Sequence, residues 1–170
     1  MTYAESLPRT GYTGCAYRDY QRKHNPAVNW QGINIAAQRN ASFQSFPQDY
    51  TLLPNVALVV PNQANDMHNG WGPAAVARGD EWLKANLDDY VRWSQIHNSL
   101  LIVTWDEDDG LAGNRIPTLF VGPMVRAGVY TEHIDHYRVL RTILAMYCLP
   151  GLGHSARSQP IDDIWVQPVR

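Results

Sequence analysis

Four consecutive carboxylates directly follow an apolar run in the second half of the chain. Residues 100–103 are Leu-Leu-Ile-Val, and Asp106, Glu107, Asp108 and Asp109 come soon after them, ahead of Gly110. Acidic residues before a glycine commonly form a turn, which is our interpretation of Asp108 and Asp109. Carboxylates packed at the end of a buried strand repel one another unless a cation neutralises them. Asp106 and Glu107 are therefore either part of a solvated turn or ligands of a metal ion.

A second polar cluster follows another apolar run, residues 56–60. It contains Asp66 and His68. If the two runs are parallel neighbours in one sheet, Asp66 and His68 should lie close to Asp106 and Glu107. Such a set of carboxylates and imidazole suits a divalent metal ion; oxygen-rich sites favour Mg²⁺, Ca²⁺ or Mn²⁺, and each added imidazole shifts the preference towards Zn²⁺. We expect a divalent cofactor, with Mg²⁺ as the first candidate.

The elements that must position these residues form an α/β pattern. The apolar runs do not alternate with polar residues, as is typical of strands buried on both faces, and two amphipathic segments predict covering helices. We predict a single domain, 1–170, with a loop-rich part (1–54) and an α/β core (55–170) whose central, mostly parallel sheet is flanked by helices. Ligands of such sheets bind beyond the carboxyl ends of the strands. The predicted strands are 56–60, 100–104 and 116–121, and the predicted helices are 81–96, capped by Asp80, and 137–147, with Val139, Leu140, Ile143 and Leu144 facing inward.

His136 stands at the predicted start of the second helix. A cap explains Asp135 before it but not the histidine itself. The helix dipole places partial positive charge at this end, which favours a neutral imidazole, the form that a metal ligand or a general base needs. His136 and His68 are our candidates for the catalytic base.

Composition limits the remaining possibilities. The chain has 170 residues, 45% of them hydrophobic, and a formal net charge of −2. It can build one ordinary domain, and its charge does not favour binding to nucleic acid or to an anionic membrane. It contains neither a run of apolar residues long enough to span a membrane nor a pattern typical of a signal peptide. Cys15 and Cys148 leave pairing and compartment open.

Four segments in order carry a resemblance to a known family. They are residues 23–26 (Lys-His-Asn-Pro), 59–68, 100–123 and 135–143. Together they resemble the phosphoesterase family, the acid phosphatase and phospholipase C branch of the alkaline phosphatase superfamily, from about Tyr3 to Trp165. The resemblance implies an alkaline-phosphatase-like core and a phosphoric ester hydrolase that acts on phosphate monoesters. Members of this family are often secreted or periplasmic.

The resemblance also implies roles for individual residues. Asp106 and Glu107 match the adjacent acidic pair that binds the metal, and Asp66 lines the site from the neighbouring strand. The spacing of Asp66 and His68 departs from the Asp-x-x-x-His ligand pair of other superfamily members. His136 matches the late histidine of the superfamily. The implied substrate-binding residues are His24, which approaches the phosphate, Lys23 beside it, and Arg138 or Arg141 for the phosphate oxygens.

The chain differs from the family at its N-terminus. Family members carry a preceding part with a Glu-Asn metal-binding pair and a Ser or Thr nucleophile, which has no counterpart here. Water activated by the metal could replace the nucleophile, and Ser6, Thr10 and Thr13 are weaker substitutes. A missing strand would expose a sheet edge and favour a homo-oligomer. The alternatives to a phosphatase are a metal-binding, catalytically weak remnant and a plain interaction domain.

Overall fold

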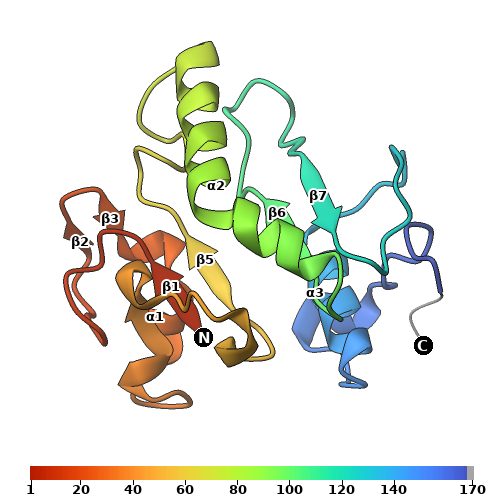
Figure 1. Cartoon of the computed structure of the whole chain (residues 1–170), viewed down its shortest axis with the longest axis horizontal. Coiled ribbons are helices and arrows are strands. Elements are labelled where there is room, and N and C mark those ends of the chain that lie inside the picture. The colour runs from red at the N-terminus through yellow and green to blue at the C-terminus, as the bar shows by residue number, and fades with distance from the viewer. Residues whose placement is uncertain (168–170) are drawn as a thin grey trace. The chain divides into compact units, whose positions relative to one another are not determined.

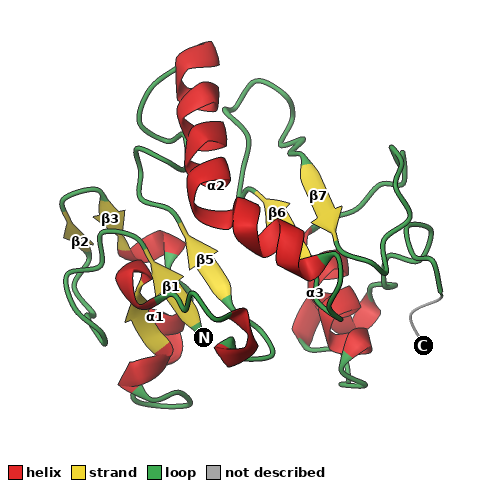
Figure 2. Ribbon diagram, in the orientation of Figure 1, coloured by secondary structure: helices red, strands yellow, loops and turns green. Residues whose placement is uncertain are grey.

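The computed structural model describes residues 1–167. Its chain divides into two compact units, Met1–Tyr90 and Val91–Arg170 (Figure 1). Strands and helices occur in both units (Figure 2). No described helix is both long enough and apolar enough to cross a lipid bilayer.

The first unit is built on a three-stranded parallel sheet. The central strand β1 (Thr2–Ala4) lies between β4 (Asn40–Ser42) and β5 (Leu58–Val60), with Tyr3 opposite both Ala41 and Val59. All three residues of β1 are buried. This sheet confirms the α/β class. Two of its three strands, β1 and β4, lie within residues 1–54, the part that was predicted to be loop-rich.

Short elements lie between the three strands of this sheet. A small antiparallel hairpin pairs β2 (Ala16–Tyr17) with β3 (Tyr20–Gln21). Single helical turns connect the strands of the parallel sheet. They are η1 (Arg22–His24), α1 (Ala27–Trp30), η2 (Ala37–Arg39), η3 (Phe43–Ser45) and η4 (Tyr50–Leu52).

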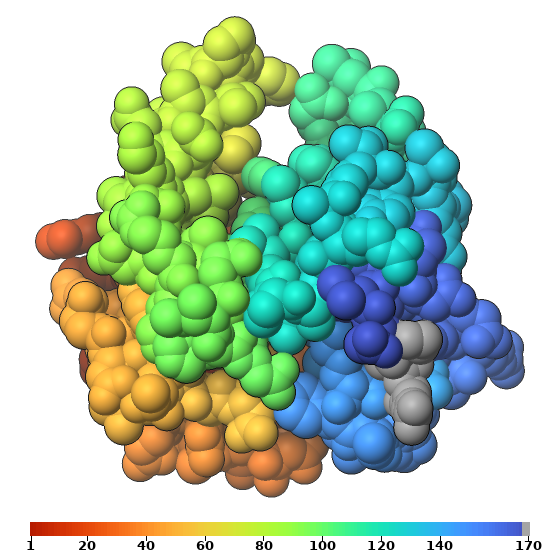
Figure 3. Space-filling model, turned by 45° about the vertical axis from the view of Figure 1, so that its right-hand side comes forward, coloured from red at the N-terminus to blue at the C-terminus, as the bar shows by residue number. Residues whose placement is uncertain are grey.

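The long helix α2 (Gly72–Ser94) begins well before the predicted start at Glu81. Pro73 lies in its first turn, where the missing N–H costs nothing, and Asp80 is inside the helix rather than at its cap. One face packs on an aromatic cluster: Phe43 lies 5.4 Å from Trp82, and the Tyr50 and Tyr90 rings lie 5.2 Å apart. Residues of α2 form the yellow-green to green band of the space-filling view (Figure 3).

The second unit contains a β-hairpin and one helix. Strands β6 (Leu101–Thr104) and β7 (Thr118–Val121) pair antiparallel, whereas β5 pairs with β1 within the first unit. That the runs 56–60 and 100–104 are parallel neighbours stays a hypothesis. Helix α3 (His136–Met146) is followed by η5 (Gly153–Arg157). The core gathers around Ile161, Ile164 and Trp165, and the predicted inward residue Leu140 is 40% exposed.

Candidate functional site

Three predicted site residues meet in the first unit. The Nδ1 atom of His24 lies 3.2 Å from Oδ2 of Asp66, and the backbone N–H of His68 donates to Oδ1 of the same carboxylate at 2.8 Å. The rings of His24 and His68 are 6.2 Å apart. A carboxylate in contact with one ring nitrogen of a histidine fixes its tautomer and stabilises its protonated form. This arrangement can therefore do acid–base chemistry.

Asp66 and His68 lie on the loop after β5, and Glu5 holds this loop in place. The Glu5 carboxylate accepts hydrogen bonds from the backbone N–H of Asn62 at 2.9 Å and from Nδ2 of Asn65 at 3.0 Å to each of its oxygens. The Asn62 side chain in turn accepts from the backbone N–H groups of Ala64 and Asn65, as in an Asx turn. Sequence reasoning missed Glu5, because its role depends on β1, which carried no recognisable pattern.

Helix α2 also contacts this loop, through Arg78 and Gly79. The guanidinium of Arg78 donates to the carbonyl of Ala64 at 2.5 Å and also to that of Asn69. Gly79 provides the space: a Cβ there would lie 2.4 Å from Cε of Met67 and 3.2 Å from the carbonyl oxygen of Asn65. The helix and the loop are in close contact around the site.

His24 is anchored by a buried amide network. Its neighbour Asn25, which is fully buried, donates from Nδ2 to Oδ1 of Asn40 at 2.8 Å. Asn40 donates in turn to Oε1 of Gln31 at 2.9 Å and to the carbonyl of Tyr12 at 2.8 Å. These bonds fix the backbone of the Lys-His-Asn-Pro segment and so direct His24 towards Asp66.

The second unit brings together the other predicted site residues, Asp106, Glu107 and His136. Nε2 of His136 lies 3.0 Å from the carbonyl oxygen of Asp106, and Oδ1 of Asp106 accepts from the backbone N–H of Glu107 at 3.1 Å. Since a carbonyl only accepts, Nε2 carries the proton, and Nδ1 is left as the basic nitrogen of the neutral ring. The predicted helix start is confirmed, because the Asp135 side chain accepts from the N–H of Arg138 at 2.8 Å.

The two acidic side chains of this group are of the donor type that a hard divalent cation prefers. Two adjacent exposed carboxylates are present, and in the described part of the chain the Glu107 carboxylate makes no hydrogen bond or ion pair. Asp66 lies in the first unit, and its place in one ligand set with Asp106 and Glu107 stays a prediction.

The other two acidic residues organise the turn, as predicted. Asp108 accepts hydrogen bonds from the backbone N–H groups of Gly110, Asn114 and Ala112, and these bonds, that of Gly110 foremost, lower its pKa. Asp109 accepts from the N–H of Leu111 at 3.0 Å.

Arg138 has structural contacts that its predicted role did not include. Its guanidinium donates to the carbonyls of Gln159, His133 and Pro160 and, at 2.6 Å, to the carboxylate of Glu132. These bonds join α3 to the segments on either side of it. None of its contacts supports phosphate binding by Arg138, which stays a prediction.

A further acidic group was not predicted. Donor atoms of Glu132, Asp162 and Asp163 lie within 4.8 Å of one another. The ion pair between Glu132 and Arg138 already places a positive charge beside them. We therefore explain this group by that ion pair and assign no metal to it.

The chain is similar to a family of known proteins. The model of the Phosphoesterase family matches residues 1–150. A phosphatidylinositol-3-phosphatase of Mycobacterium tuberculosis is 47% identical over 167 residues, which are 97% of this chain and 54% of that protein. An acid phosphatase of Aspergillus fumigatus is 29% identical (89% of this chain, 37% of that protein), and a phosphate-repressible acid phosphatase of Penicillium chrysogenum is 27% identical (89% and 40%). The chain thus spans about half or less of the length of these relatives. No solved structure matches it significantly.

Proposed function

We propose that this chain hydrolyses phosphate monoesters with the help of a divalent metal ion. The chain belongs to the Phosphoesterase family, whose model matches residues 1–150. The observation that carries the proposal is the contact of His24 with Asp66, beside His68. The names of the relatives, a phosphatidylinositol-3-phosphatase and several acid phosphatases, support phosphate esters as the substrate class. An inositol lipid phosphate is one candidate substrate, and small phosphomonoesters are others.

In the proposed reaction, water attacks phosphorus, the bond from phosphorus to the ester oxygen breaks, and the alcohol leaves with a proton. His24, whose Nδ1 is in contact with Asp66, takes or gives this proton. The exposed Lys23 beside it adds positive charge for the phosphate.

Within the second unit we propose His136 as a further base, with Nδ1 as its basic nitrogen, and the carboxylates of Asp106 and Glu107 as the metal-binding pair. A divalent ion bound by these carboxylates supplies charge neutralisation and a lowered pKa for bound water. The alternative proposal, a metal-binding protein without turnover, keeps the same ligands but lacks the reaction.

Replacing Asp66 by Asn tests the proposal on a simple aryl phosphate monoester. The amide keeps the shape but does not stabilise the charged imidazole, so kcat/KM should fall at least about a hundredfold, within the usual contribution of a general base. Asp109→Asn is the matched control, because Asp109 bonds only within its turn, and it should change kcat/KM less than about twofold. Equal losses in both variants would contradict the role of Asp66.

A further inference from the structure

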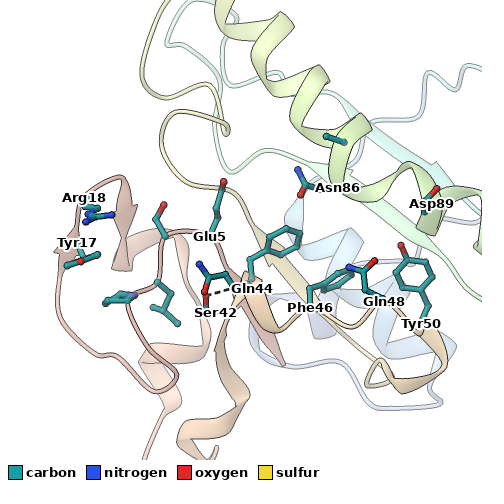
Figure 4. A pocket seen from close by; sticks show the side chains of 15 residues that line it. Glu5, Tyr17, Arg18, Ser42, Gln44, Phe46, Gln48, Tyr50, Asn86 and Asp89 are labelled. Atoms are coloured by element: carbon teal, nitrogen blue, oxygen red, sulfur yellow. Dashed lines mark hydrogen bonds between the residues drawn. The ribbon is translucent and has the colours of Figure 1, made fainter.

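We infer that a groove in the first unit binds the alcohol part of the substrate, and that this part is a neutral, hydroxyl-rich ring such as a polyol or a sugar. The inference rests on the proposed function, since it concerns the group that the phosphate is attached to. The groove has a volume of about 640 Å³ (Figure 4). This volume lies within the range of roughly 300–1,000 Å³ that is typical of sites for small molecules.

Amide side chains line the groove from two walls. Gln44 and Gln48 come from the segment that follows β4, and Asn86 comes from α2 opposite them (Figure 4). In the described part of the chain, the side-chain amides of Gln44 and Gln48 make no hydrogen bonds, and Asn86 uses only its Nδ2, which donates to the carbonyl of Trp82 at 2.8 Å. An amide offers a donor and an acceptor together, which is the pair that a hydroxyl group needs.

Aromatic rings form the apolar part of the same groove. Phe43 and Phe46 are stacked at 5.3 Å with an interplanar angle of 26°, and Tyr50 lies beyond Phe46, 6.2 Å away. All three side chains are only half-buried. The C–H face of a sugar or polyol ring is apolar while its edge carries hydroxyls, so a ring stacked on an aromatic face directs those hydroxyls towards surrounding amides.

The charges in the groove argue against an anionic ligand. Two carboxylates line it, those of Glu5 and Asp89, against one basic side chain, Arg18, whose guanidinium lies 5.4 Å from the centre of the Tyr17 ring. A phosphate placed there would face carboxylates of its own sign. A neutral polyol would meet no such repulsion.

Glu5 connects the groove to the proposed catalytic residues. It lines the groove and also accepts both hydrogen bonds from Asn65, the residue next to Asp66. The phosphate held near His24 and Asp66 would thus lie next to the groove that holds its alcohol. This arrangement predicts that the chain prefers polyol phosphates to phosphates of planar aryl alcohols.

Two substitutions, Gln44→Ala and Asn86→Ala, test this preference. The readout is the ratio of kcat/KM for myo-inositol 1-phosphate to kcat/KM for 4-nitrophenyl phosphate. Each substitution removes an amide that would bond the ring hydroxyls, so the ratio should fall about tenfold. Asn86→Ala also removes the bond to the carbonyl of Trp82, which Gln44→Ala leaves in place. Gln38→Ala removes an exposed glutamine amide outside the groove and should leave the ratio unchanged. An unchanged ratio in both groove variants overturns the inference.

Binding of free myo-inositol, followed by saturation-transfer NMR, separates this inference from the proposed function. The wild-type protein should give a binding signal that Asn86→Ala loses and Gln38→Ala keeps, whether or not any phosphate is hydrolysed. Absence of turnover on every phosphate ester overturns the proposed function alone. Absence of the NMR signal in the wild-type protein overturns the groove.

Discussion

His136 is a residue whose position the sequence predicted and whose orientation only the structure supplies. It begins α3, as expected, and its Nε2 contacts the carbonyl oxygen of Asp106 at 3.0 Å. This contact places the imidazole beside the acidic pair and leaves Nδ1 as the basic nitrogen. His136→Ala should lower kcat/KM at least about a hundredfold on an aryl phosphate, because it removes this base. The melting temperature should barely change, since the exposed side chain contributes little packing.

The control for that variant is His133→Ala, which removes another exposed histidine of the same unit that lies outside the candidate site. Both variants are to be assayed for kcat/KM and melting temperature on the same preparations. Near-normal turnover in His136→Ala would show that the contact with Asp106 is structural only. A large drop in melting temperature with a proportionate loss of activity would lead to the same conclusion.

The role of a single residue could be predicted from the sequence where its type allows few roles, as for histidine and aspartate. His24, Asp66 and His68 were chosen from sequence and do lie together, and the turn role of Asp108 and Asp109 is confirmed by their bonds to loop amides. Glu5 could not be found in this way. Its carboxylate acts on a loop about sixty residues away, and that contact exists only because β1 pairs with β5.

At the scale of elements, the contact between α2 and the loop after β5 gives a prediction about Gly79. Alanine is the better helix former by about 1 kcal/mol, so Gly79→Ala should not destabilise the helix itself. Its Cβ would, however, meet Cε of Met67 at 2.4 Å and the carbonyl oxygen of Asn65 at 3.2 Å. The Met67 side chain must turn away and the carbonyl of Asn65 must shift by a few tenths of an ångström, which displaces the neighbouring Asp66 slightly. We expect kcat/KM to fall about tenfold with little change in melting temperature, because small displacements of catalytic groups are costly.

The double variant Gly79→Ala with Met67→Ala serves as the internal check. Shortening Met67 removes the closest contact, so the double variant should recover most of the activity that Gly79→Ala loses. Met67→Ala alone should be close to wild type. If the double variant is no better than Gly79→Ala, the loss does not come from the packing of this loop on α2.

The long helices could be predicted from the sequence, whereas the shortest strands could not. Both long helices were expected, although α2 was placed too late because Gly79, next to the assumed cap Asp80, weakens the helical pattern. Strands β1 and β4 are three residues each and include Thr2, Asn40 and Ser42, so neither length nor hydrophobicity marks them. Pairing was the harder problem, and β6 pairs antiparallel with β7 because a single loop joins them.

At the scale of the whole molecule, the proposed function predicts that the chain binds a metal ion and needs it to hydrolyse its substrate. The resemblance implies a divalent ion at Asp106 and Glu107, and the Glu107 carboxylate has no hydrogen-bond or ion-pair partner in the described part of the chain. Exhaustive dialysis against EDTA should abolish hydrolysis of an aryl phosphate, and added Mg²⁺, Mn²⁺ or Zn²⁺ should restore it, because a bound divalent ion lowers the barrier for water attack. Metal analysis after removal of excess ion should give about one ion per chain.

Glu107→Gln and Asp109→Asn complete this experiment, since each removes one negative charge from the same acidic run. Glu107→Gln should lose both the bound ion and the restored activity, because an amide is a weaker ligand for a hard cation. Asp109→Asn should keep both, since Asp109 bonds to the N–H of Leu111 within its turn. Bound metal without turnover would identify a metal-binding remnant, and absence of both would identify an interaction domain. Hydrolysis that continues at an unchanged rate in EDTA would rule out the metal-dependent mechanism while leaving the acid–base role of His24 and Asp66 in place.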